Sequence, residues 1–206
     1  MKAALITFEG IDFCGKSAQI EQLIQKLEKK RIDYLLLREP GGTVFAEKIR
    51  SVLLTKENET MDPTTEYLLY SAARAQLTRN RIIPALKAGQ LVICDRFFDS
   101  STAYQGYGRG IDLDFIHQIN KFATAGINPD LTILIDIDLK EMECRKQKLS
   151  KQLDRMEDQK SNFFRQVRSG YLTIARQEPE RFRVLNGKRT VSAIAEEVWQ
   201  QVQAFL

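Results

Sequence analysis

The sequence has few of the residues that build metal sites and disulfide frameworks. Its three cysteines, Cys14, Cys94 and Cys144, lie far apart and form no C-x-x-C pair, so no disulfide framework is expected. It has one histidine, His117, and this excludes a zinc site built from cysteine and histidine. A reducing compartment such as the cytoplasm is the simplest location for a chain of this kind.

Long apolar runs are also missing, and no basic segment followed by an apolar one opens the chain. We therefore expect neither secretion nor insertion into a membrane. With 206 residues and no repeat or linker, the sequence predicts a single domain over residues 1–206. Its net charge of +4 does not call for nucleic acid. This charge suits a small anionic substrate if the cations are clustered.

Near the N-terminus, residues 10–17 match the pattern G-x-x-x-x-G-K-[ST] of a phosphate-binding loop, or P-loop. An apolar run precedes the loop, and a helical apolar pattern follows it. Backbone N–H groups and a helix N-terminus would cradle phosphates, Lys16 would supply a cation, and the Ser17 hydroxyl would bind Mg²⁺. The expected ATP-binding loop residues are Gly10, Ile11, Asp12, Phe13, Cys14, Gly15, Lys16 and Ser17.

Short apolar runs alternate with helical patterns along the chain. Runs that are apolar at nearly every position indicate parallel strands buried on both faces. The sequence therefore predicts an α/β protein with three layers, in which helices flank a five-stranded parallel sheet. Ligands bind beyond the carboxyl ends of such strands. The five expected strands are 4–8, 34–37, 91–94, 131–135 and 182–185.

Polar residues follow the second and third of these runs. After the second comes Arg38 with a Pro-Gly-Gly turn, and Thr43 is a plausible cap for a helix through Leu54. After the third comes Asp95, whose carboxylate would organise Mg²⁺ at the active edge of the sheet. The neighbouring Arg96 would bridge two phosphoryl groups. A tight turn and a buried Asp–Arg pair are the structural alternatives.

Two further stretches suggest a nucleotide base site. Tyr70 and Arg74 lie four residues apart in a helical stretch over 65–88, so they share one face, where a ring and a guanidinium can hold a base or a phosphate. Packing with a surface charge is the alternative. Residues 99–110 are polar and read as a loop. In this loop Gln105 offers a donor and an acceptor to the edge of a base, and Tyr104 offers a flat wall.

A basic run occupies residues 145–157 and predicts a short lid over a nucleotide. Lys148, Lys151 and Arg155 recur at helical spacing. A solvated helix face is the ordinary alternative for such a run. A lid has a purpose in phosphoryl transfer, because excluded water cannot hydrolyse the donor.

These parts together indicate phosphoryl transfer between two anionic nucleotides, in which positioning and charge neutralisation do most of the work. A regulatory GTPase would need an N-K-x-D guanine motif, and the candidate at Asn120 lacks the aspartate. A nucleotide-binding module without catalysis and a kinase for another nucleoside monophosphate stay open.

The sequence resembles the bacterial type of the thymidylate kinase family over nearly its whole length. Two stretches are specific to that family, R-E-P-G-G-T at 38–43 and A-Y-Q-G at 103–106. The F-E-G-I-D and G-K-S segments of the P-loop, D-R-F at 95–97 and Asp154-Arg155 also match. The resemblance implies a homodimer that transfers the γ-phosphoryl group of ATP to dTMP with Mg²⁺.

The resemblance also implies roles for individual residues. Lys16 would hold the ATP phosphates, Asp12 would face the acceptor or Mg²⁺, and Arg145 would lie near adenine. Catalysis would use Asp12, Lys16, Arg96, Lys148 and Lys151, and the metal would meet Ser17, Asp95 and Glu157. The implied dTMP site comprises Asp12, Arg38, Tyr70, Arg74, Arg96, Ser101, Tyr104 and Gln105.

The sequence departs from the family pattern at three places. Phe13 stands where similar enzymes carry Gly or Arg, and Ala18 replaces a hydroxyl residue. Without an arginine in the P-loop, the transition-state cation is expected from the lid. The lid is rich in lysine, which lacks the bidentate fork of arginine.

Overall fold

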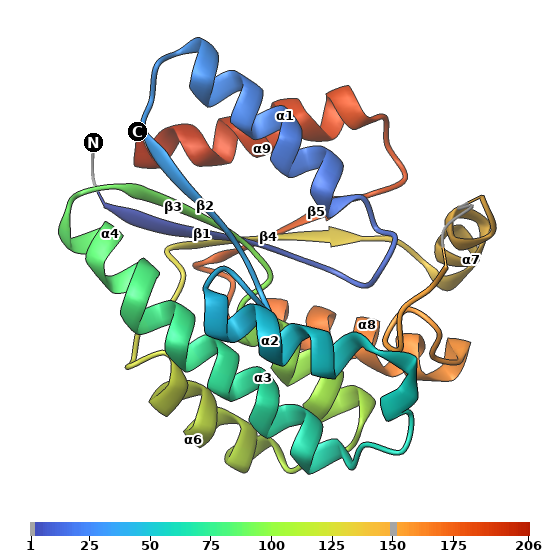
Figure 1. The fold of residues 1–206 in the computed structure, drawn as a ribbon. Coiled ribbons are helices and arrows are strands. Elements are labelled where there is room, and N and C mark those ends of the chain that lie inside the picture. The colour runs from blue at the N-terminus through green and yellow to red at the C-terminus, as the bar shows by residue number, and fades with distance from the viewer. Residues whose placement is uncertain (1–2, 149–151) are drawn as a thin grey trace.

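Five parallel strands form the centre of the molecule in the computed structural model, which describes residues 3–148 and 152–206. The order in the sheet is β2-β3-β1-β4-β5, and Figure 1 shows the strands between two layers of helices. All five expected strands are confirmed, and each continues one residue further than its apolar run. The strands are β1 (Ala4–Glu9), β2 (Tyr34–Arg38), β3 (Leu91–Asp95), β4 (Leu131–Asp136) and β5 (Phe182–Asn186).

Burial follows the position of each strand in the sheet. Every residue of the central strand β1 is buried, as expected for a strand covered on both faces. The edge strands β2 and β5 contain exposed residues, Leu36 and Val184 among them. Since the strands are parallel, their carboxyl ends meet at one edge, and the polar residues that follow β1, β2 and β3 come together there.

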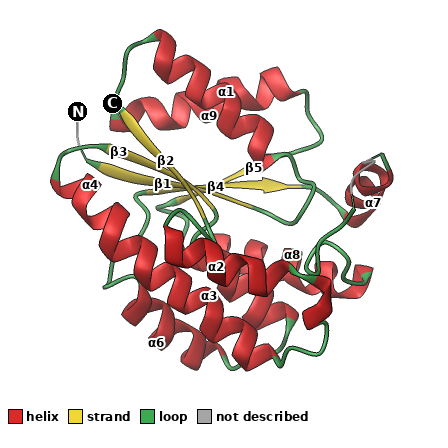
Figure 2. Cartoon of the chain, viewed as in Figure 1, coloured by secondary structure: helices red, strands yellow, loops and turns green. Residues whose placement is uncertain are grey.

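Helices α1 and α9 cover one face of the sheet, and the larger helical layer covers the other (Figure 2). The predicted cap of α2 is confirmed, because the Thr43 side chain accepts a hydrogen bond from Ala46 N. The α-helices are α1 (Lys16–Lys29), α2 (Val44–Leu54), α3 (Pro63–Leu77), α4 (Ile83–Lys87), α5 (Phe98–Ser101), α6 (Leu113–Ala123), α7 (Leu139–Gln147), α8 (Ser161–Gln177) and α9 (Val191–Val202).

The sequence predicts a helical stretch over 65–88 that Pro84 can kink. The structure has helices over this stretch, and a π-helical turn, η2 (Thr78–Ile82), separates α3 from α4 just ahead of Pro84. Another stretch differs from the sequence expectation. The stretch 99–110, predicted as a loop, is instead helical: α5 leads into the π-helix η3 (Thr102–Gly108). Short polar residues and glycines suggested a loop there, but packing against α8 and α6 keeps the segment helical.

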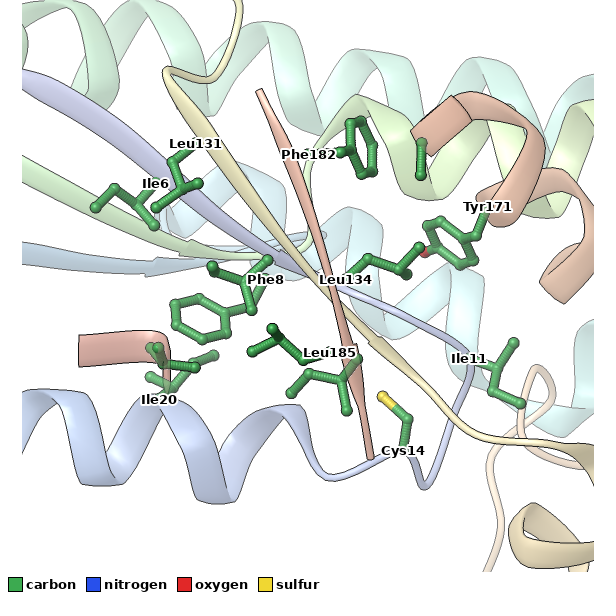
Figure 3. Packing of buried hydrophobic residues seen from close by; sticks show 14 of the residues in the cluster. Ile6, Phe8, Ile11, Cys14, Ile20, Leu131, Leu134, Tyr171, Phe182 and Leu185 are labelled. Carbon is green, nitrogen blue, oxygen red and sulfur yellow. The ribbon is translucent and has the colours of Figure 1, made fainter. Parts of the chain in front are cut away.

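The main hydrophobic core lies around the central strands and continues to both helical layers. Figure 3 shows several of its members, among them Phe8 of β1, Ile20 of α1 and Tyr171 of α8. Because β1 is held from both faces, the loop that leaves its carboxyl end starts from a rigid point. Among the described residues, no helix is both long enough and apolar enough to cross a bilayer.

Candidate active site

The P-loop connects β1 to α1 at the carboxyl edge of the sheet, as its motif predicts. Gly10 has a φ of 140° and Gly15 a φ of 102°, values that glycine adopts without a steric penalty. A Cβ atom at position 10 would also lie 2.5 Å from the Ile135 carbonyl oxygen. The loop therefore bends over the start of α1, where free backbone N–H groups and the positive helix end favour phosphate.

Lys16 is the first residue of α1 and is 8% exposed. Its Nζ donates to the Gly10 carbonyl oxygen at 3.1 Å and to the Ile11 carbonyl oxygen at 3.3 Å. These carbonyl partners are neutral, so the positive charge stays available to an anion held in the loop.

Ser17 and Asp95 line one cavity together with Arg38. Asp95 Oδ1 is buried and has no hydrogen-bond partner among the described residues. An unpaired buried oxygen is costly, and a hard cation would satisfy it. A hydroxyl beside this carboxylate suits Mg²⁺, which takes most of its remaining ligands from phosphates and water. Glu157 lines a different pocket, so the three predicted metal residues are not all together.

A separate pocket, here called the acceptor pocket, opens beside the P-loop. It brings together seven of the eight residues predicted for dTMP, which are Asp12, Tyr70, Arg74, Arg96, Ser101, Tyr104 and Gln105. Arg38 is the exception. It lies in the cavity of Ser17 and Asp95, where its Nη2 forms an ion pair with Glu47 at 2.9 Å.

Arg96 lies between the P-loop and the acceptor pocket. Its Nη2 pairs with Asp12 Oδ1 at 2.6 Å, and its Nη1 donates to the Gly10 carbonyl oxygen at 3.0 Å. It follows β3 in a left-handed conformation with φ 70°. Burial opposes ionisation of Asp12, but Arg96 and Lys16 outweigh it, so the pKa of Asp12 lies below its usual value. The structural alternative, a buried pair of Asp95 with Arg96, is not found among the described residues, because Arg96 pairs with Asp12.

Glu9 is linked to Arg96 through two hydroxyl groups. Its Oε1 accepts from Phe97 N at 2.7 Å, and its Oε2 accepts from Ser100 Oγ at 2.6 Å and Tyr171 OH at 2.8 Å. The same two hydroxyls receive hydrogen bonds from Arg96 Nη1, at 3.1 and 3.2 Å. Burial, with the carboxylate of Asp99 nearby, raises the pKa of Glu9 to about 7.

Arg74 and Tyr70 point from one face of α3 into the acceptor pocket, as their spacing predicts. Arg74 is 2% exposed, and its Nε pairs with Glu39 Oε2 at 2.8 Å. Its Nη1 donates to Asn120 Oδ1 at 3.2 Å and its Nη2 to Ser101 Oγ at 3.0 Å. The residue is thus part of a buried polar network as well as of the pocket wall.

Comparison with known proteins identifies the family. The family model described as "Thymidylate kinase" matches residues 8–198. The curated "Thymidylate kinase" of Caldanaerobacter subterraneus subsp. tengcongensis is 46% identical and aligns with all of this chain and 98% of its own. That of Pelotomaculum thermopropionicum is 43% identical, over all of this chain and 95% of its own.

A solved structure agrees with the sequence comparisons. The crystal structure of thymidylate kinase from Ehrlichia chaffeensis superposes with a TM-score of 0.80 and 33% identity, over 98% of this chain and 99% of that one. The chain belongs to the thymidylate kinase family. The predicted family and the predicted P-loop α/β fold are therefore confirmed.

In this family member, the region predicted as a lid is only partly as expected. Helix α7 ends at Gln147 and Arg155 lies in a turn, so Lys148 and Arg155 do not share one helix face. Lys148 is exposed just after the helix, and Lys151 lies outside the described residues. Arg155 is buried and pairs with Glu66 at 2.6 Å. It is therefore not available as a mobile lid cation, contrary to its helical spacing with the two lysines.

Arg145 touches the P-loop directly. Its Nη1 donates to the Cys14 carbonyl oxygen at 2.9 Å and its Nη2 to the Gly187 carbonyl oxygen at 2.7 Å. Glu141, one turn earlier on α7, fixes its Nε at 2.7 Å. The guanidinium thus ties α7 to the outer side of the phosphate loop and to the turn after β5.

Sequence reasoning did not single out three residues of this thymidylate kinase site. Glu39 and Arg50 line the acceptor pocket, and the buried Glu66 holds Gln105 from behind. Glu39 lies inside the R-E-P-G-G-T stretch, which was an available signal. Arg50 and Glu66 look like ordinary charged positions on helices, and only the tertiary contacts set them apart.

Proposed function

We propose that the chain catalyses transfer of the γ-phosphoryl group of ATP to dTMP, giving dTDP and ADP. The observation that carries this proposal is the pairing of a P-loop with a separate acceptor pocket, bridged by Arg96. The bond between the γ-phosphorus and the oxygen bridging to the β-phosphate breaks. A new bond forms from the same phosphorus to a phosphate oxygen of dTMP.

The residues of the P-loop and of Arg96 supply positioning and positive charge. The loop amides and Lys16 would bind the donor phosphates, and Arg96 would neutralise charge between donor and acceptor. Asp12 holds Arg96 through its 2.6 Å ion pair, so the guanidinium needs no reorganisation when the substrates meet. Asp12 would also face the acceptor phosphate.

On the acceptor side, Tyr70 would stack on the base, and Arg74 with Gln105 would bind its edge. Ser101 would lie against the same nucleotide. Tyr104, whose hydroxyl donates to Asp12 Oδ2 at 2.8 Å, would crowd the ribose 2′ position and favour a deoxy sugar. Arg38 would act on the donor side, since it shares the cavity of Ser17 and Asp95.

Mg²⁺ is part of the proposal. Ser17 and Asp95 would hold it, because the unpaired buried oxygen of Asp95 lies in the cavity that both residues line. When bound, the metal neutralises charge on the donor phosphates. Glu157 would reach the acceptor side, since it lines that pocket.

The segment over about 145–157 would close the site against water, with Lys148 and Lys151 as the transition-state cations and Arg145 near adenine. We assign residues 1–206 to one nucleoside monophosphate kinase domain that acts in the cytoplasm, where its substrates are found. The functional unit would be a homodimer built through helices.

A coupled assay of ADP release across a panel of nucleoside monophosphates tests the proposal. We expect dTMP to be the best acceptor, ahead of dUMP, CMP and dCMP, and Lys16→Ala to lower turnover by roughly 10²-fold or more with the fold retained. A different preferred acceptor would assign the chain to another monophosphate. ATP binding without ADP release on any acceptor would indicate a binding module.

A further inference from the structure

Glu66 of α3 binds three side chains from two other segments beneath the acceptor pocket. It is 1% exposed. Its Oε1 accepts from Gln105 Nε2 at 2.9 Å and Arg109 Nε at 3.2 Å. Its Oε2 accepts from Arg155 Nη1 at 2.6 Å and Arg109 Nη2 at 3.1 Å. Each of its two oxygens therefore receives two donors.

The surroundings of Glu66 keep it ionised. Burial alone would raise its pKa, but the charge and hydrogen bonds of Arg109, with those of Gln105 and Arg155, lower the pKa below its usual value. An ionised carboxylate only accepts hydrogen bonds. Gln105 must therefore turn its amide nitrogen, not its oxygen, toward Glu66.

This contact decides what Gln105 presents to the pocket. No described residue donates a hydrogen bond to its Oε1, and this oxygen is not fully buried. Gln105 itself lines the acceptor pocket. Because the amide is planar, pinning Nε2 on Glu66 directs Oε1 away from it and leaves an acceptor for the base.

We propose that Glu66 is a positioning residue that fixes the Gln105 amide, so that the pocket selects a pyrimidine carrying a hydrogen on N3. This inference rests on the proposed function. Gln105 offers an acceptor and Arg74 a donor to the same space. A thymine-like edge, with the N3 hydrogen beside the O4 oxygen, matches both groups. A cytosine edge, with an accepting N3 and an amino group, opposes both.

The variant Glu66→Gln tests the inference. Its neutral amide can donate to Gln105 Oε1, and this permits the Gln105 amide to turn over. We expect the KM for dTMP to rise about tenfold, with kcat changed only a few-fold. The ratio of kcat/KM for dTMP to that for dCMP should fall by at least about tenfold, because the polarity of the pocket is no longer fixed.

The variant Gln105→Leu provides a second, independent test. It removes the acceptor without touching the bonds of Glu66 to its two arginines, so the selectivity ratio should fall there too, even if Glu66→Gln does not fold. In the Gln105→Leu background, Glu66→Gln should change the ratio no further, since the two residues act through one contact. Additive effects in this double-mutant cycle would contradict the mechanism.

Asp99→Asn is the matched control. Asp99 is also buried and ion-paired, at 2.7 Å with Arg181, and its carboxylate accepts hydrogen bonds from Arg181 and not from Gln105. We expect a lower melting temperature and an unchanged dTMP to dCMP ratio. An unchanged ratio in both Gln105→Leu and folded Glu66→Gln would overturn the inference. A wild-type chain that does not phosphorylate dTMP would instead overturn the proposed function.

Discussion

Arg74 is bound by protein groups on three sides. The Glu39 carboxylate, the Asn120 side-chain oxygen and the Ser101 hydroxyl accept its hydrogen bonds. From the sequence, loss of Arg74 is expected mainly to raise the KM for dTMP. The buried network adds a structural consequence, because Glu39 is 4% exposed and loses its cation when Arg74 is removed.

We therefore predict that Arg74→Ala lowers the free energy of unfolding by roughly 3–5 kcal/mol, in addition to raising the KM for dTMP. Denaturant unfolding with steady-state kinetics measures both effects. Arg50→Ala is the control, because Arg50 lines the same pocket but is half-buried and donates to the Pro40 carbonyl oxygen. An Arg74 variant as stable as wild type would restrict this arginine to substrate binding.

Phe13 shows how one residue departs from its family without breaking the loop. Its φ of 64° is left-handed, which explains why glycine is usual there, and such a conformation costs a residue with a side chain about 1–2 kcal/mol. The ring packs against the main core beside Cys14, and this contact offsets part of the cost. The sequence shows that Phe13 departs from the family pattern, but only the backbone angle explains why glycine is usual at this position.

At the scale of elements, Glu9 connects β1 with α5 and α8 through Ser100 and Tyr171. Burial raises its pKa to about 7, from 4.5 for an ordinary glutamate. Between these values the folded chain binds a proton that the unfolded chain does not. The stabilisation from Glu9 is therefore complete below about pH 4.5 and is lost as pH rises through about 7.

We predict that the contribution of Glu9 to the free energy of unfolding falls by roughly 3 kcal/mol between pH 5 and pH 8. Urea unfolding at four pH values across this range measures the slope. Glu39, whose pKa burial also raises to about 7 against the opposing charge of Arg74, acts in the same direction. The Glu9→Gln variant should therefore reduce the change of the free energy of unfolding with pH only partly. If this change is as large in the variant as in wild type, Glu9 is not its source.

The elements differ in how far sequence predicts them. The strands follow from apolar runs, but each continues one residue further, because backbone pairing does not stop at a polar side chain: Asp95 still pairs with Arg38 and Phe8. The π-helix η3 was missed, since tertiary packing stabilises it. A Cβ atom on Gly108 would lie 2.7 Å from the Phe163 ring of α8, so its glycine serves close packing and not a flexible turn.

The sequence indicates the residues of the candidate site more clearly than the residues that hold them in position. Motif residues such as Lys16 and Arg96 lie together because parallel strands end at one edge. Glu9 reaches Arg96 through the Ser100 and Tyr171 hydroxyls, and Glu66 contacts Gln105. Both contacts join segments that are far apart in the chain. A single sequence carries no periodicity that would reveal such contacts.

At the scale of the whole molecule, the outer helical layer exposes apolar side chains. Leu68 of α3 is 47% exposed, and Phe115 and Phe122 of α6 are 37% and 74% exposed. The two helices lie side by side on the side away from the sheet (Figure 1). Such a surface is typical of protein interfaces, and the proposed homodimer would bury it.

We predict that the wild-type chain sediments at about twice its monomer mass of 23.7 kDa. The double variant Leu68→Glu and Phe122→Glu should sediment as a monomer, because apposed carboxylates in an apolar interface repel and lose their hydration. Val184→Glu is the control, since Val184 is 48% exposed but lies on the edge strand β5. A monomeric wild type at micromolar concentration would refute the homodimer. A double variant that stays dimeric would place the interface on another face, since the two charges would then lie outside it.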